Sequence, residues 1–173
     1  MATIRRLEPR DDRAGFRSGE ADLDRFFAKY AGQNQFRNHI GTTYVAVDED
    51  SGVLGYVSVS PAILELEELP VKVRKGLPQY PLPVLRLARL AVSKDYQGQG
   101  LGKALTRFVL ELATRMAEDV GCFAVVVDAK PGRASFYEGL GLEPLDLVEG
   151  DSPARPQPTT LFLPVAEIRA AMR

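Results

Sequence analysis

The sequence has very few of the residues that build metal centres and disulfides. Its 173 residues include one cysteine, Cys122, one histidine, His39, and no tryptophan. A single cysteine excludes an intramolecular disulfide, and one residue of each type excludes zinc sites built on several histidines or several cysteines. We therefore expect no bound metal, and a reducing compartment is the simpler interpretation of the cysteine content.

Long apolar runs are also missing. No run approaches the roughly 18 residues that a membrane-spanning helix needs. The first ten residues carry Arg5, Arg6, Glu8 and Arg10 and lack the apolar region of a signal peptide. We expect a soluble, cytoplasmic protein with no membrane partner.

Net charge is nearly absent, but it is distributed unevenly. The whole chain has 22 Lys and Arg against 23 Asp and Glu, a formal net charge of −1. Between Lys72 and Arg107 there are eight basic residues and one acidic residue, so this segment is +7 and the remainder is −8. A neutral average thus hides a basic middle that could face a polyanion.

Periodicity of apolar residues predicts alternating strands and helices. Helices are expected over residues 23–31, with Ser18 as a candidate cap, over 101–116, and from Pro131 through Tyr137. Strands are expected over residues 4–7, 42–47, 53–59, 84–92, 123–127, 142–147 and 159–163. The second and third strands form a hairpin through Gly52, and residues 151–158 form a proline-rich loop. This order predicts an α+β (mixed α/β) fold, with a sheet of mixed direction, helices on both faces and one domain over residues 1–173.

The most informative stretch is the glycine-rich turn from Gln97 to Lys103, between a buried strand and an amphipathic helix. The first amide groups of such a helix lack intrahelical acceptors, and the helix dipole favours an anion there, so a pyrophosphate is the natural ligand. The spacing fails the P-loop pattern, since Ala104 follows Lys103, and it fails the dinucleotide fingerprint as well. The alternative is a turn that only closes a strand–helix connection.

These residues resemble the GCN5-related N-acetyltransferases, the GNAT family, whose Q/R-x-x-G-x-G/A loop matches Gln97–Gly102. Residues 134–138 are similar to the family's A-x-x-F-Y element, in which the tyrosine faces the coenzyme sulfur. The resemblance implies the GNAT fold, with a mostly antiparallel central sheet, and acetyl-CoA as co-substrate. It implies coenzyme contacts from Leu90, Ala91, Val92, Gln97, Gly98, Gln99, Gly100, Leu101, Gly102, Lys103 and Phe136.

Further stretches resemble the acetyltransferase toxins of toxin–antitoxin pairs, which act on aminoacyl-tRNA. The matches are F-R-S-G at 16–19, L-D-R-F-F at 23–27, L-P-Q-Y-P-L-P at 77–83 and L-A-R-L-A-V at 87–92. Small departures from the pattern are Ala88, where glycine is usual, with Ser93 and Leu142. The resemblance implies an aminoacyl-tRNA substrate, a ribbon–helix–helix antitoxin, DNA contact only through the antitoxin complex, and a homodimer.

Acetyl transfer to an amine needs a neutral amine, donors for the oxyanion and a proton for the leaving thiolate. We expect Tyr137 to be the general acid and backbone N–H groups near Val92 to face the oxyanion, whereas a packed core tyrosine is the alternative. No general base is evident. Candidate tRNA contacts are Arg89, Arg86, Lys75 and Arg74; because their odd spacing puts Arg86 and Arg89 on opposite faces of a regular strand, we favour Arg89.

Three alternatives remain open. The chain could acetylate a small amine, a peptide or a protein N-terminus without being a toxin. It could be a silent acyl-CoA sensor, against which Tyr137 argues. Cys122 could be a nucleophile with His39 as its base, although a small buried hydrophobe and a surface histidine at a helix end are favoured.

Overall fold

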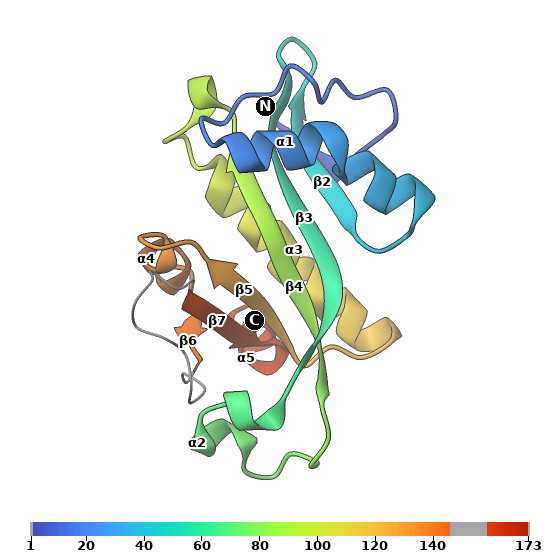
Figure 1. The fold of residues 1–173 in the computed structure, drawn as a ribbon. Coiled ribbons are helices and arrows are strands. Elements are labelled where there is room, and N and C mark those ends of the chain that lie inside the picture. The colour runs from blue at the N-terminus through green and yellow to red at the C-terminus, as the bar shows by residue number, and fades with distance from the viewer. Residues whose placement is uncertain (1, 146–158, 173) are drawn as a thin grey trace. The chain divides into compact units, whose positions relative to one another are not determined.

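A computed structural model describes residues 2–145 and 159–172 (Figure 1). The strands are β1 Thr3–Arg6, β2 Thr42–Asp48, β3 Gly52–Leu64, β4 Leu82–Val92, β5 Ala124–Ala129, β6 Glu143–Pro144 and β7 Thr159–Pro164. The helices are α1 Ala21–Lys29, α2 Val71–Arg74, α3 Leu101–Asp119, α4 Ala134–Glu138 and α5 Val165–Ala171. A π-helical turn, Gln33–Arg37, follows α1, and 3-10 turns occupy Leu66–Glu68 and Lys94–Tyr96.

Within the described residues, the strands form one seven-stranded sheet in the order β1-β2-β3-β4-β5-β7-β6. The β1–β2, β2–β3, β5–β7 and β6–β7 pairs are antiparallel. The predicted fold class, a mixed α/β fold with a mostly antiparallel sheet, is confirmed. β4, whose continuous apolar run predicted a mid-sheet position, is the fourth strand of seven.

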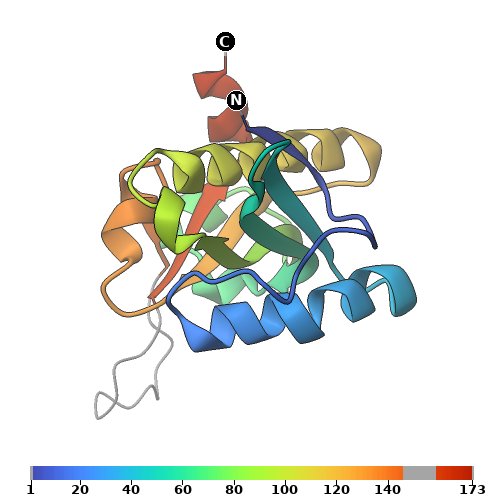
Figure 2. The ribbon, with the colours of Figure 1, turned by 90° about the horizontal axis from the view of Figure 1, so that it is seen from above.

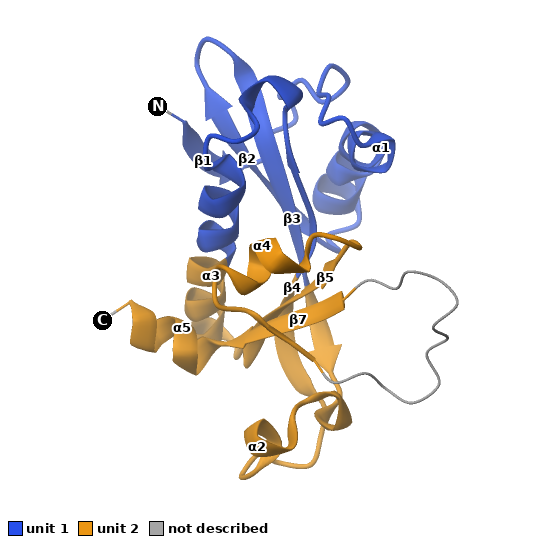
Figure 3. Ribbon diagram, turned by 90° about the vertical axis from the view of Figure 1, so that its left-hand side faces the viewer, with its two compact units in different colours: residues 1–60, 87–109 blue, residues 61–86, 110–173 orange. Residues whose placement is uncertain are grey.

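The chain divides into two compact units, which Figure 3 distinguishes by colour. Unit 1 contains residues 1–60 and 87–109, and unit 2 contains residues 61–86 and 110–173. β3, β4 and α3 each contribute residues to both units, so the division runs through continuous elements.

In unit 1, β2 and β3 carry different side chains to their two faces, because successive residues of a strand alternate. The register pairs Val45 with Tyr56 and Tyr44 with Val57. Tyr56 stacks on Phe27 of α1 with ring centroids 4.5 Å apart, whereas Tyr44 contacts Phe108 of α3 at 4.7 Å. Helices α1 and α3 therefore lie on opposite faces of these strands, as Figure 2 shows.

The Tyr56 hydroxyl lies inside the α1-side core. It donates a 2.7 Å hydrogen bond to the Leu23 carbonyl, so the buried oxygen has a partner. Burial raises the pKa of Tyr56 well above its ordinary value, because the charged phenolate would lose its hydration. The side chain thus joins helix and sheet as a neutral group.

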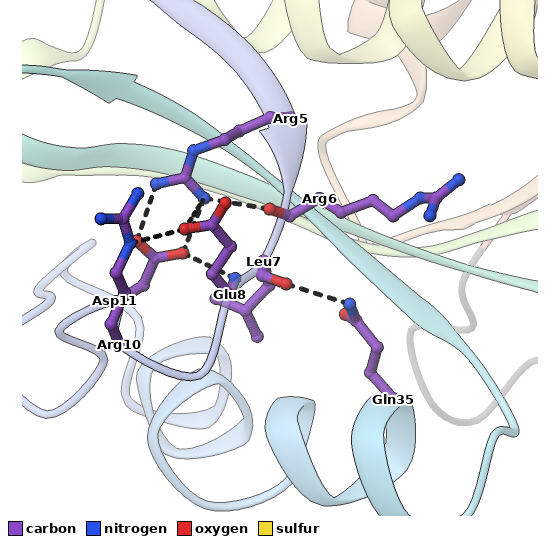
Figure 4. Close-up of polar contacts among 7 residues, drawn as sticks. All are labelled: Arg5, Arg6, Leu7, Glu8, Arg10, Asp11 and Gln35. Carbon is purple, nitrogen blue, oxygen red and sulfur yellow. Dashed lines mark hydrogen bonds and ion pairs between the residues drawn. The ribbon is translucent and has the colours of Figure 1, made fainter.

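The edge strand β1 is held in unit 1 by polar contacts (Figure 4). Both terminal nitrogens of Arg5 donate to the carboxylate of Asp11 at 2.8 Å. The Gln35 amide donates to the Leu7 carbonyl at 3.1 Å and accepts from the Thr43 backbone N–H at 2.9 Å. The amide of Gln35 therefore binds the backbone both at the end of β1 and within β2.

In unit 2, β5, β7 and β6 form an antiparallel group next to the short helices α4 and α5. One apolar cluster joins residues before α2 to strand residues; its fully or nearly fully buried members are Leu64, Leu69, Leu82, Val84, Ala124, Val126 and Phe162. Val165 and Ile168 bury the apolar side of α5.

Several predicted boundaries are wrong. Pro131 does not begin a helix: α4 begins at Ala134, because Gly132 has a left-handed φ of 84° that a helix cannot continue through. Ser18 is not the cap of α1, whose N-cap is Glu20. The Ser18 hydroxyl instead donates to Asp24 of α1 at 2.7 Å.

Other boundaries shift. β3 extends to Leu64, and β6 covers only Glu143–Pro144 of the strand predicted over 142–147, whose last two residues lie outside the described part, as does the loop 151–158. Helix α5 was not predicted. Gly52 has the expected positive φ, 69°.

No helix in residues 2–145 and 159–172 is both long and apolar enough to cross a membrane. The same residues contain no group of three or more His, Cys, Asp or Glu side chains arranged to hold a metal ion.

Candidate functional site

The glycine-rich turn connects β4 to α3 within unit 1. Gly98 and Gly100 have φ values of 79° and 87°, a left-handed conformation that costs other residues about 1–2 kcal/mol. The Ala104 N–H donates to the Gly100 carbonyl at 3.0 Å, so the helical hydrogen bonding starts at Gly100. The N–H groups of Leu101, Gly102 and Lys103 precede this bond in the first turn of α3, where the helix itself provides no acceptor for them. The backbone geometry at the start of α3 thus offers N–H donors that an anion could accept from.

Space is open beside this turn. A Cβ atom built on Gly98 or Gly100 would meet no heavy atom within 4 Å, and Gln99 and Lys103 are exposed. The glycines are therefore required by their dihedral angles rather than by crowding. A phosphate could reach the amides, and Lys103 could add a positive charge.

The side chain of Gln97 holds the turn in place. Its amide nitrogen donates to the Ser18 carbonyl at 2.8 Å and to the Val92 carbonyl at 3.0 Å. Those two bonds tie the turn both to the segment before α1 and to the end of β4. Sequence spacing indicated a coenzyme contact at this position but could not reveal the bonds to the backbone.

The predicted coenzyme strand, Leu90–Val92, is the end of β4. Ala91 is buried in the α1-side core, and Leu90 and Val92 are half-buried. Gly55 of β3 passes close by: a Cβ there would lie 3.0 Å from the Ala91 carbonyl oxygen. The Ser93 N–H then donates to the Leu54 carbonyl at 2.7 Å, which fixes where β4 leaves the sheet.

Tyr137 lies on α4 in unit 2, whereas the glycine-rich turn belongs to unit 1. Its side chain is 7% exposed, and its ring contacts Phe136 edge-on with centroids 5.0 Å apart. Burial raises the pKa of Tyr137 to about 12, although the positive charge of Arg133 acts in the opposite direction. The phenol is therefore protonated at neutral pH, as a proton donor must be.

The predicted tRNA contacts differ in their surroundings. Arg86 forms an ion pair with Asp128 of β5, and Asp128 also accepts a 2.6 Å hydrogen bond from Thr160. Arg89 is exposed, and its guanidinium lies 3.9 Å from the centroid of the Phe26 ring. In α2 and its C-cap, Arg74 is half-buried and Lys75 is exposed. The charge of Arg86 is partly neutralised, whereas that of Arg89 faces solvent.

Sequence reasoning missed the residues around Arg89. Phe26 was expected only as a core residue, and a pocket beside it was not expected. The pocket lies entirely in unit 1 between α1, β2, β3 and β4, and has a volume of about 50 Å³. Helical periodicity marked Phe26 as buried, but it carries no information about which strand residue lies over the ring.

The alternative site at Cys122 is not supported. Cys122 is buried, its thiol donates to the Ala124 carbonyl, and burial raises its pKa, so the thiolate is disfavoured. His39 is exposed at the end of the π-helical turn, with a φ of 55°. Both observations agree with the favoured interpretation of a small buried hydrophobe and a surface histidine.

Comparison with known proteins gives consistent similarities. Residues 39–144 match the model of a family described as acetyltransferase (GNAT) domain. A tRNA-acetylating toxin of Mycobacterium tuberculosis (strain ATCC 25618 / H37Rv) is 33% identical over 142 residues, which cover 80% of this chain and 82% of the relative.

Two solved structures are similar over nearly the full length. AtaT complexed with acetyl-methionyl-tRNAfMet has a TM-score of 0.85 at 27% identity, with both chains covered completely. A tyrosine-to-phenylalanine mutant of AtaT bound to the C-terminus of the antitoxin AtaR and to acetyl-CoA has a TM-score of 0.78 at 25% identity, covering 99% of this chain and 98% of the other.

Proposed function

The chain belongs to the GNAT family and is an N-acetyltransferase, and we propose that it acetylates the α-amine of aminoacyl-tRNA as a translation-blocking toxin. The observation that carries this proposal is the arrangement of unit 1. One strand, β4, bears an exposed cation at Arg89 and leads directly into the anion-binding turn at the start of α3. A polyanionic acceptor and a phosphate-bearing donor would thus meet the same strand.

The residues of the turn fit the pyrophosphate of acetyl-CoA. The positive φ of Gly98 and Gly100, the open space beside them and the first amides of α3 provide donors that a phosphate can reach. In the proposal, Gln99 and Lys103 border the phosphates, and Leu90–Val92 and Phe136 contact the rest of the coenzyme. Gln97 acts by positioning the turn. Acetyl-CoA supplies the acetyl group as a reactive thioester.

The reaction replaces one bond to the acetyl carbon. The amine nitrogen bonds to that carbon while the carbon–sulfur bond breaks; the amine releases a proton and the sulfur takes one up. Tyr137 would supply the proton to the sulfur, because its phenol stays neutral well above physiological pH. Backbone N–H groups near Val92 would face the developing negative charge on the acetyl oxygen. An α-amine ester has a lower pKa than a lysine side chain, so a dedicated base is not required.

The tRNA would be held chiefly through its phosphates, with Arg89 and Lys75 as the exposed contacts. Arg74 and Arg86 would contribute less, because Arg74 is half-buried and Arg86 is paired with Asp128. Such contacts release counterions, so binding would weaken steeply as salt rises.

The proposed partners follow from the toxin role. A ribbon–helix–helix antitoxin would bind this chain, and DNA would be contacted only through that antitoxin complex. We further propose a homodimer, a cytoplasmic location, where charged tRNA occurs, and a single acetyltransferase domain over residues 1–173.

Incubation with radiolabelled acetyl-CoA and total charged tRNA tests the proposal. We expect label on tRNA that mild alkaline cleavage of the aminoacyl ester releases as N-acetyl amino acid, and growth arrest on expression without the antitoxin. Uncharged tRNA is the matched control and should stay unlabelled. Label on small amines or peptides, with none on tRNA, would instead favour an acetyltransferase of small acceptors.

A further inference from the structure

A carboxylate is exposed on β5, an interior strand of the sheet, in unit 2. The other residues of β5 are buried, whereas the side chain of Asp128 is 40% exposed. Two donors hold it: Arg86 of β4 pairs with Oδ2, and the Thr160 hydroxyl of β7 donates to Oδ1 at 2.6 Å. All three residues belong to unit 2. The carboxylate is therefore fixed in one position that solvent can reach.

This carboxylate has acceptor capacity left over. Each carboxylate oxygen can accept about two hydrogen bonds, and each oxygen of Asp128 accepts one from the described residues. Asp11 differs, because its carboxylate accepts from both terminal nitrogens of Arg5 and from the Glu8 backbone N–H, and its side chain is 8% exposed. Asp128 can thus bind a further donor from solvent, whereas Asp11 is nearly closed off.

Hydrogen bonds within unit 2 connect Asp128 to the proposed proton donor. Helix α4, which bears Tyr137, contacts β7 and lies beside the end of β5 (Figure 1). The Tyr137 carbonyl accepts from the Leu142 N–H at 3.2 Å, just before β6. Just after β6, the Leu145 N–H donates to the Thr160 carbonyl at 2.8 Å, and Thr160 binds Asp128. Asp128 and Tyr137 are therefore held in the same part of unit 2.

Resting on the proposed function, we propose that Asp128 binds the α-amine of the acceptor, with Arg86 and Thr160 as positioning residues. An N–H of the amine donates to the remaining acceptor sites of the carboxylate. Because that N–H points at Asp128, the nitrogen lone pair points elsewhere and can face the acetyl carbon. Asp128 then recognises the group that uncharged tRNA lacks.

The chemistry of transfer requires the amine to be near Tyr137. In the proposed reaction the nitrogen attacks the carbon whose bond to sulfur breaks, and Tyr137 protonates that sulfur. Nitrogen and sulfur are therefore attached to the same carbon during transfer, and a group that binds the amine must lie in this region. When the amide forms, the nitrogen loses its charge and keeps one N–H, so its bond to the carboxylate weakens and the product is released.

The alternative is an ion pair that only covers an open part of the sheet. The side chains of Arg86 and Asp128 are 38% and 40% exposed, and ion pairs between exposed side chains contribute little to stability. A structural role therefore gives little reason for placing both charges on interior strands. A phosphate would have to compete with Asp128 for Arg86, whereas an amine meets acceptor sites that the pair leaves open.

Binding of acylated tRNA tests the assignment. One tRNA sequence is charged by an acylating ribozyme with glycine, alanine, methionine or phenylalanine, or with the matching acid that has hydrogen in place of the amine. Affinity is measured at about pH 6, where the amine is largely protonated, with CoA present, which has no acetyl group to transfer. For the wild type we expect each aminoacyl-tRNA that it acetylates to bind about ten-fold more tightly than its deaminated counterpart.

Asp128→Asn should reduce this preference to about two-fold or less, while affinity for acetyl-CoA stays unchanged. Because the substitution also releases Arg86, uncharged tRNA and the deaminated acyl-tRNAs should bind as well as before or more tightly. Thr160→Val removes one support of the carboxylate and should reduce the preference in part. The matched control is Glu118→Gln, which breaks an exposed pair with Arg169 elsewhere in unit 2 and should behave as the wild type.

The outcomes distinguish the two proposals. Equal wild-type affinities for aminoacyl-tRNAs and their deaminated counterparts, or an unchanged preference in Asp128→Asn, would overturn the role of Asp128 and leave the proposed function standing. So would an equal loss of affinity for every tRNA in Asp128→Asn, which indicates a structural role. If Asp128→Asn does not fold, an unchanged preference in Thr160→Val overturns the inference instead. If the wild type acetylates none of the aminoacyl-tRNAs, both proposals are wrong.

Discussion

The guanidinium of Arg89 lies over the ring of Phe26, with its central carbon 3.9 Å from the ring centroid. The two residues come from β4 and α1, and the ring holds an otherwise mobile cation in one position. Arginine stacks on aromatic faces while keeping its outer N–H groups available for phosphate, which lysine cannot do as well. In the proposed function, this pair would preorganise Arg89 for contact with an RNA phosphate.

Replacing Arg89 by glutamine should therefore raise KM for charged tRNA about ten-fold and reduce the slope of log affinity against log salt by about one. Affinity for acetyl-CoA should stay unchanged, and Arg89→Glu should weaken tRNA acetylation much more than acetyl-CoA hydrolysis. The matched variant Arg86→Gln should have a smaller effect on KM, because Asp128 already pairs with Arg86. Equal loss of tRNA acetylation and acetyl-CoA hydrolysis would count against an RNA contact.

Tyr137→Phe should retain acetyl-CoA binding and lose most turnover, by a factor of about 100 or more, since it removes only the proposed proton donor. Steady-state kinetics and calorimetric titration with acetyl-CoA separate the two effects. Tyr44→Phe serves as the comparison, because it removes the hydroxyl of another buried tyrosine that lies outside the proposed site. Turnover close to that of the wild type in Tyr137→Phe would contradict the role of proton donor and favour the alternative, a packed core tyrosine.

Ionisation of Tyr137 should occur well above the ordinary tyrosine range, near pH 12. Because the folded-state pKa is raised, the contribution of Tyr137 to stability is present below about pH 10 and is lost as the pH rises through about 12. A difference absorbance titration of wild type against Tyr137→Phe measures this ionisation. The activity profile should show no alkaline decline from Tyr137 below pH 10, and a phenol that titrates below pH 10 would contradict the burial argument.

Gly100→Ala should weaken acetyl-CoA binding, because the φ of 87° costs alanine about 1–2 kcal/mol and distorts the amides at the start of α3. Gly52→Ala is a close control, since Gly52 has a φ of 69° and is equally uncrowded but lies in the β2–β3 hairpin. Both variants should lose similar stability in urea, and only Gly100→Ala should lose coenzyme affinity. Equal affinities of the two variants for acetyl-CoA would show that the turn does not bind the coenzyme.

Asp11→Asn should destabilise the protein by about 1–3 kcal/mol, because Asp11 accepts both terminal nitrogens of Arg5 as well as the Glu8 backbone N–H. These contacts lower the pKa of Asp11, so its stabilising contribution is present above about pH 4 and is lost as the pH falls through the depressed folded-state pKa. Urea melts at several pH values measure this. Arg10→Gln, which breaks only the exposed pair with Glu8, should change stability by about 0–1 kcal/mol.

Much of the element order was predictable, because apolar periodicity and glycine position act locally. The run from Val84 to Val92 and the amphipathic pattern after Leu101 predicted β4 and α3, and both are present. Two local predictions were wrong. The helix predicted from Pro131 does not start there, because Gly132 has a left-handed φ. Ser18 does not cap α1, because its hydroxyl donates to the Asp24 side chain instead.

For the candidate site, the sequence by itself determined the turn, since only glycine adopts the φ values of Gly98 and Gly100 without strain and the following residues form a long helix. Only the tertiary structure decided which cations remain available. Arg86 meets Asp128, and Arg89 meets Phe26 beside a small pocket, because folding brings together side chains that are far apart in the chain. The sequence shows which residues of a strand are charged. The partner of each charge, its exposure and the space beside it depend on how other elements pack against the strand.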